Sequence, residues 1–127
     1  MSSLTVFSII ESPTHPNFSD VYLRLNVDAI MLNSMRKAIS KLKTTRPDYV
    51  VAEFFYGYGN NYAGVNISNL DVFLHSMQKY APDAKVIVVV DKTEREYVDK
   101  LHDLFPLHAV LQHPVNSMEL EILLKGS

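Results

Sequence analysis

Cysteine and histidine, the residue types that most often bind transition metals, offer few candidate sites in this chain. Cysteine is absent, which excludes disulfides, thiolate metal sites and cysteine nucleophiles. No metal-ligand spacing is present at four of the five histidines, His15, His75, His102 and His108. The fifth, His113, stands in HPVNSMEL, between a short apolar run and a helical pattern. A histidine there could be a metal ligand, a pH-sensitive switch or a partly buried hydrogen-bonding group.

The stretch FFYGYGNNYAGVNISN, residues 54–69, is rich in aromatic residues and glycines. It holds three of the four glycines and five aromatic residues, Phe54, Phe55, Tyr56, Tyr58 and Tyr62. Loops longer than about 12 residues are usually functional or mobile, and tyrosines on a glycine-rich chain make adaptable contact surfaces. Recognition of a protein partner, a dimer mate or a planar ligand is one interpretation, which we favour for Tyr56 and Tyr58. Packing onto the domain is the other, which we favour for the two phenylalanines. A phosphate cradle is not predicted, because no lysine follows the glycines.

Length and charge narrow the possible classes of protein. A chain of 127 residues is long enough for one domain with its own core. Its 12 Lys+Arg and 14 Asp+Glu residues are scattered, without the basic patch of a nucleic-acid binder. No apolar run approaches the roughly 20 residues that cross a bilayer, and the start MSSLTVFSII lacks the basic residues of a signal peptide. We therefore expect a single cytoplasmic domain with no nucleic-acid or membrane partner.

Short apolar runs alternate with helical patterns along the chain. Five runs predict strands at residues 4–10, 29–32, 49–54, 85–90 and 109–112. They are mostly apolar rather than alternating, as in strands covered on both faces. Helical i, i+3, i+4, i+7 spacing occurs at Met35, Ala38, Ile39 and Leu42, and again at Leu70, Phe73, Leu74 and Met77. This order predicts right-handed βαβ units and a doubly wound sheet of about five parallel strands.

The helix starts and the first helix are less clearly marked. Ser68 and Thr93 each stand three residues before an acid, as in a capping box, and Asn116 or Ser117 stands before a helical pattern at residues 119–124. Residues 12–26 contain two prolines and no clean periodicity, which leaves room only for a short first helix over residues 19–25.

Three segments resemble a known family. RPDYVVAEF, KVIVVVDKTEREYV and AVLQHPVNSMELEILL resemble strands three, four and five of bacterial response-regulator receiver domains, the CheY-like family. The most specific elements are the Pro-Asp pair before strand three and the basic-Pro-apolar step before the last helix. The resemblance covers roughly residues 26–124, with residues 4–12 as the first strand. It implies a three-layer, flavodoxin-like α/β fold with strand order 2-1-3-4-5 and a site at the carboxyl ends of the strands.

The resemblance also assigns positions in that site. Receivers place two acids after strand one and an Asp at the end of strand three, which together hold Mg²⁺, and the last Asp accepts a phosphoryl group. In this chain the acid pair falls on Glu11 and Ser12, and the acceptor position falls on Glu53. Two glutamates hold an octahedral Mg²⁺ less well than aspartates, so we expect no metal and no other cofactor. Glu53 could instead imitate a phosphorylated Asp, or simply be a tolerated polar residue.

The groups that bind the phosphoryl oxygens in receivers are replaced as well. The family has Ser or Thr at the end of strand four, where this chain has Val90, followed by Asp91 at a position that is usually small. A valine side chain cannot donate a hydrogen bond, so we expect Val90 to be a packing residue. The family's lysine after strand five falls on His113, and the His-Pro step would keep the turn without the lysine charge. With Glu11, Glu53 and Asp91, His113 could form an acidic cluster that favours the protonated imidazole.

These replacements predict a degenerate receiver, or pseudo-receiver. We expect a signalling module, not an enzyme, that acts by binding a protein partner or an output domain. A domain cut from a longer regulator is one interpretation of the chain. The resemblance places a partner or homodimer face on the fourth helix, fifth strand and fifth helix, with Leu101, Leu104, Phe105, Val110 and residues 118–124 on or near it. Two alternatives stay open. One is a working phosphoreceiver with unusual site residues, and the other is a flavodoxin-like flavin carrier.

Overall fold

Five parallel strands form one sheet in the order β2-β1-β3-β4-β5. The strands are β1 (Thr5–Ile9), β2 (Asp28–Leu32), β3 (Tyr49–Glu53), β4 (Lys85–Val90) and β5 (Leu107–Gln112). The helices are α1 (Ser19–Leu25), α2 (Met35–Leu42), α3 (Asp71–Tyr80), α4 (Arg95–Val98) and α5 (Ser117–Lys125), with a 3-10 turn η1 (Lys92–Glu94) before α4. This computed structural model describes residues 4–9, 18–54, 70–99, 105–112, 115 and 117–125. The predicted strand order and the predicted fold class are confirmed.

The middle of the sheet is covered on both faces, as the apolar strands predict. Every residue of β3 is buried, and β4 is buried after its first residue. Successive side chains of a strand point to opposite faces, so these strands feed two separate cores. One core contains Phe7, Val50 and Val88, and the other contains Val6, Val51 and Val89. The edge strands β2 and β5 are only partly buried, which fits their place at the ends of the sheet.

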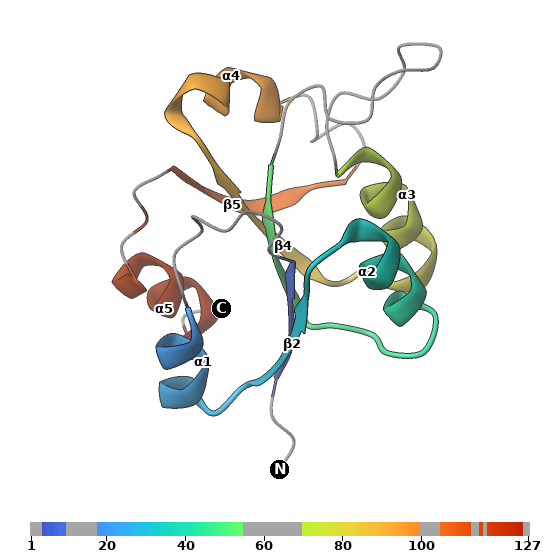
Figure 1. Cartoon of the computed structure of the whole chain (residues 1–127), viewed down its shortest axis with the longest axis horizontal. Helices are drawn as coiled ribbons and strands as arrows, with labels where there is room; N and C mark the ends of the chain where they lie inside the picture. The colour runs from blue at the N-terminus through green and yellow to red at the C-terminus, as the bar shows by residue number, and fades with distance from the viewer. Residues whose placement is uncertain are drawn as a thin grey trace.

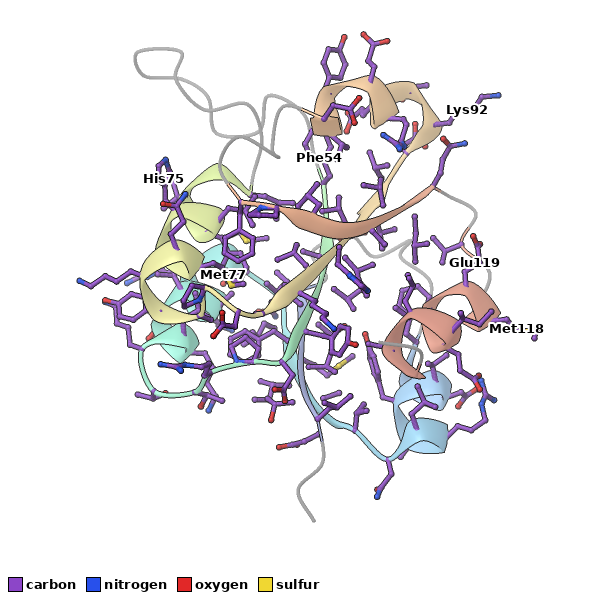
Figure 2. All side chains as sticks on the ribbon, turned by 180° about the vertical axis from the view of Figure 1, so that it is seen from behind. Phe54, His75, Met77, Lys92, Met118 and Glu119 are labelled. Carbon is purple, nitrogen blue, oxygen red and sulfur yellow. The ribbon has the colours of Figure 1, made fainter. Side chains whose placement is uncertain are left out.

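Two pairs of helices cover the two faces (Figure 1). Helices α2 and α3 pack against each other on one face, and α1 and α5 pack against each other on the other. Met77 lies on the sheet side of α3 and is buried, whereas His75 lies on its outer side (Figure 2). On the opposite face, α1 and α5 are also joined by an ion pair between Arg24 and Glu121, with 2.7 Å between Nη2 and Oε1.

The first helix is as short as predicted, and Asn26 ends it. Asn26 has φ 57° and ψ 41°, a left-handed conformation that asparagine adopts more readily than most residues. Its backbone N–H donates to a carbonyl of the last turn, as does the N–H of Val27. Val21 and Tyr22 anchor the helix to the sheet because both are buried.

The predicted helix starts are correct in part. The cap predicted at Ser68 lies outside the described residues and stays a prediction; α3 begins at Asp71, after Leu70. The cap predicted at Thr93 is wrong. The turn before α4 is capped by Asp91, not by Thr93. Within the described ranges no helix is long and apolar enough to cross a membrane.

Candidate functional site

The carboxyl ends of the strands meet at one edge of the sheet, where the sequence predicts the site. Ile9 of β1 pairs with Ala52 of β3, and Glu53 pairs with Val89 of β4. The next residue of β4, Val90, pairs with Gln112 at the end of β5. The end of β3 therefore lies between the ends of β1 and β4, which is the position of the acceptor residue in a receiver-like sheet.

Glu53 is a buried carboxylate at this edge, with only 3% of its surface exposed. Strand alternation puts its side chain on the same face as Tyr49 and Val51, over which α1 and α5 pack. Burial of a charged group is unfavourable unless other groups bind it or it takes up a proton.

Val90 is a core residue with no exposed surface. It belongs to the apolar cluster under α2 and α3, on the face opposite to that of Glu53. The prediction that Val90 is a packing residue is therefore confirmed. An isopropyl group supplies no hydrogen-bond donor for a phosphoryl oxygen.

Asp91 is engaged in local structure. Its Oδ2 atom accepts hydrogen bonds from the backbone N–H of Thr93, at 3.1 Å, and from the Thr93 hydroxyl. These bonds cap the turn η1, whose first donors would otherwise lack partners. The side chain of Asp91 is exposed and turned toward η1. His113 and Glu11 lie outside the described residues, so the predicted cluster of these residues with Asp91 stays a prediction.

Phe54 directly follows β3, and its side chain is buried in the core. Its backbone N–H donates to the carbonyl of Val89 at 2.9 Å, and its side chain is 2% exposed. It lies at the end of β3 below α4, among residues of the α2 and α3 core (Figure 2). For Phe54 the structure therefore agrees with the packing interpretation rather than with recognition.

A buried hydrogen bond between β1 and α1 was not foreseen from the sequence. The Tyr22 hydroxyl donates to Ser8 Oγ at 3.0 Å, and both residues are at most 3% exposed. Burial raises the pKa of Tyr22 to about 12, although the bond to Ser8 acts in the opposite direction. The signal that could have revealed the pair is Ser8 itself, because a hydroxyl inside a buried apolar strand needs a partner.

Several predicted site residues lie outside the described residues. They are Glu11, Ser12, Phe55, Tyr56, Tyr58, Tyr62, Leu101, Leu104 and His113, and their roles stay predictions. Within the ranges that the structure does describe, no group of three or more His, Asp or Glu side chains could hold a metal ion. The possible Mg²⁺ site at Glu11 and Glu53 is not tested, because Glu11 lies outside the described residues.

The predicted interaction face is only partly exposed. Phe105 is not a surface residue, because it is 4% exposed and packs into the core, and Val110 is partly buried against the same cluster. On α5, Met118 and Ile122 are 65% and 63% exposed. Met118 points away from the sheet (Figure 2). Among the described residues of this face, the large exposed apolar side chains are thus Met118 and Ile122 of α5.

Comparison with known proteins places this architecture among receiver domains. A response regulator from Thermotoga maritima superposes with a TM-score of 0.74 and 16% identity, over 98% of this chain and 96% of that one. The signal receiver domain of a putative Luxo repressor protein from Vibrio parahaemolyticus gives 0.73 and 14%, over 97% and 88%. The BeF3-activated DrrB receiver domain gives 0.74 and 12%, over 98% and 96%. The chain therefore has the fold of response-regulator receiver domains.

Comparison of whole sequences gives no match. No protein-family model matches the chain, and no curated protein matches it. At these identities the structural likeness establishes the fold, and the function has to be argued from the residues at the edge of the sheet.

Proposed function

We propose that this chain is a degenerate receiver, a signalling module that binds a protein partner or output domain and does not transfer a phosphoryl group. The fold supports a receiver-type role, since receiver domains are generally non-enzymatic signalling modules. The site residues support the loss of phosphotransfer. Two replacements carry that part of the proposal, Glu53 at the acceptor position and Val90 at the hydroxyl position.

Val90 is the single observation on which the proposal depends most. Phosphoryl transfer relies almost wholly on positioning and on groups that neutralise charge on the transferred oxygens. Val90 is buried in the core and supplies neither a hydrogen bond nor a charge. Removing one such donor from a preorganised site commonly slows a reaction by about 100-fold or more. Glu53 is unfavourable for phosphoryl transfer as well, because its side chain is one methylene longer than that of Asp and is buried.

Residues 54–69 are the segment to which we assign partner recognition, with Tyr56 and Tyr58 as the contact residues. The support is their position directly after Glu53 and their aromatic and glycine content. Phe54 is excluded from this role because it lies in the core. A few buried residues, tyrosines among them, commonly contribute most of the binding energy of an interface. Tyr56 and Tyr58 are therefore the residues to which we assign the main contacts.

Beryllofluoride binding tests the loss of phosphotransfer. This phosphoryl analogue occupies the acceptor site of a competent receiver, as in the activated DrrB domain. We expect no change in the backbone amide spectrum of this chain near residues 53 and 90–93 when Mg²⁺ and beryllofluoride are added together. Mg²⁺ with fluoride alone is the control for salt effects. Saturable shifts at these amides that require beryllium would favour the alternative, a working phosphoreceiver.

A further inference from the structure

The opposite edge of the sheet, where the strands begin, contains a cavity of about 380 Å³. It is formed where β1, β3 and β4 start side by side. Its lining comes from Leu4 before β1, residues 46–49 at the start of β3 and residues 83–85 at the start of β4. This cavity is separated by the length of the strands from the edge that holds Glu53.

Hydrogen bonds of Asp48 hold the floor of the cavity in place. Asp48 Oδ2 accepts from the backbone N–H of Thr5 at 2.8 Å, and the Asp48 N–H donates to the Thr5 carbonyl at 2.8 Å. On its other side, the Asp48 carbonyl accepts from the N–H of Lys85 at 3.0 Å. The three strand starts are thus tied together through one residue, so the cavity has a defined shape.

Charges of both signs line this cavity. Arg46 and Lys85 are cationic, and Asp48 and Asp83 are anionic. The Nζ atom of Lys85 lies 5.6 Å from the centre of the Tyr49 ring, a cation–π distance that holds the ammonium near the wall. A simple anion would meet both carboxylates in this cavity, and a simple cation would meet both cations. A ligand with one charge of each sign fits the lining better.

Tyr49 adds an unsatisfied polar group beside the cavity. The residue is 2% exposed, and its hydroxyl has no hydrogen-bond partner among the residues that the structure describes. The hydroxyl oxygen itself is buried, so it takes no part in the binding proposed below. Tyr49 is also one of the residues that line the cavity.

We propose that this cavity binds a small zwitterion of the amino-acid class. Arg46 and Lys85 bind its carboxylate, Asp83 binds its ammonium group, and its uncharged part packs on Leu4 and Pro47. A volume of about 380 Å³ is near the lower end of the range for ligand pockets, roughly 300 to 1,000 Å³, which suits a molecule of this size. The inference goes beyond the proposed function and does not depend on it, because it concerns a different edge of the sheet.

Titration with L-leucine, followed by backbone amide spectra, tests this inference. We expect L-leucine to shift the amides of residues 46, 48–49 and 83–85 in a saturable way, with a dissociation constant of about 1 mM or lower. Acetate and methylammonium, which carry one charge each, should bind at least about tenfold more weakly. If L-leucine leaves these amides unshifted, or if acetate binds as well as L-leucine, the inference is wrong.

Charge-removing variants make the test specific to the cavity. Arg46→Gln and Asp83→Asn should each weaken L-leucine binding by at least about tenfold, since each removes the partner of one charged group. Both residues are exposed, so the variants should fold. Lys92→Gln and Asp99→Asn are the matched controls, because they remove equivalent exposed charges outside the cavity and should leave the affinity unchanged. Equal affinities for all four variants and the wild type would overturn the proposal.

Discussion

Tyr22 and Tyr49 are both buried on the α1 and α5 face, but their hydroxyls differ. The Tyr22 hydroxyl donates to Ser8, whereas that of Tyr49 has no partner among the described residues. A net hydrogen bond contributes about 1 kcal/mol, and an unsatisfied buried group costs about 1 to 3 kcal/mol. The same substitution, tyrosine to phenylalanine, should therefore have opposite effects at the two positions.

Tyr49→Phe should raise the free energy of unfolding by about 1 kcal/mol, because it removes a buried hydroxyl that has no described partner. The measurement is urea unfolding in the absence of small-molecule ligands. Tyr22→Phe is the control and should lower the free energy by about 1 kcal/mol, since it leaves Ser8 Oγ buried without its donor. A loss of stability in Tyr49→Phe would show that its hydroxyl has a partner in solution.

Tyr22 also predicts a loss of stability at high pH. Its pKa is about 12 in the folded chain, against a usual value of 10.0. The unfolded chain therefore releases this proton first, and the contribution of Tyr22, complete below about pH 10, falls as the pH rises toward 12. The total contribution to the free energy of unfolding is roughly 3 kcal/mol. Urea midpoints at about pH 8 and pH 11 should differ less in Tyr22→Phe than in the wild type. An equal difference would show that Tyr22 ionises normally.

At the edge of the sheet that holds Glu53 and Val90, the sequence predicts the burial of some residues and not of others. Val90 is apolar and ends an apolar strand, so its packing role follows from its type alone. The burial of Glu53 does not follow, because a glutamate at a strand end is usually exposed. The burial of the Glu53 side chain depends on residues that are distant in the sequence. The cavity at the other edge was missed for the same reason, since its charged residues come from separate strand starts.

At the scale of elements, helix α2 matches its predicted bounds because two independent signals agree. Its apolar spacing runs from Met35 to Leu42, and Ser34 Oγ accepts from the Lys37 N–H at 3.2 Å. The start of α4 was mispredicted because Asp91 and Thr93 are both good capping residues two positions apart. The sequence pattern does not predict the 3-10 turn Lys92–Glu94, which contains Thr93. The start of β5 was placed too late because polar His108 interrupts the apolar run at an irregular pairing.

Ser34→Ala tests the cap of α2. We expect a loss of about 1 kcal/mol in the free energy of unfolding, because the alanine cannot accept from the Lys37 N–H. Ser40→Ala is the matched control: it makes the same change at an exposed position inside the helix, where alanine is the better helix former. Its stability should be unchanged or slightly higher. Equal losses in both variants would mean that the cap is not a stabilising feature.

At the scale of the whole molecule, the strand order separates two edges with different properties. Parallel strands bring all carboxyl ends to one edge and all amino ends to the other, and the crossover between β2 and β3 places β1 between them. At the first edge, Glu53 and Val90 are both buried, and we propose that they stand where a receiver has its acceptor and hydroxyl groups. At the second, Asp48 of the Pro-Asp pair has a clear structural role, because it joins the start of β3 to that of β1.

The central claim is that the receiver fold persists here without phosphotransfer. Intact mass spectrometry after incubation with Mg²⁺ and acetyl phosphate tests it most directly, with a phosphorylatable receiver domain treated in parallel to prove the donor active. We expect the control to gain one phosphoryl group and this chain to keep its mass, since Val90 cannot stabilise the transferred charge. A mass increase of one phosphoryl group that is lost in Glu53→Gln would contradict the account and establish Glu53 as an acceptor.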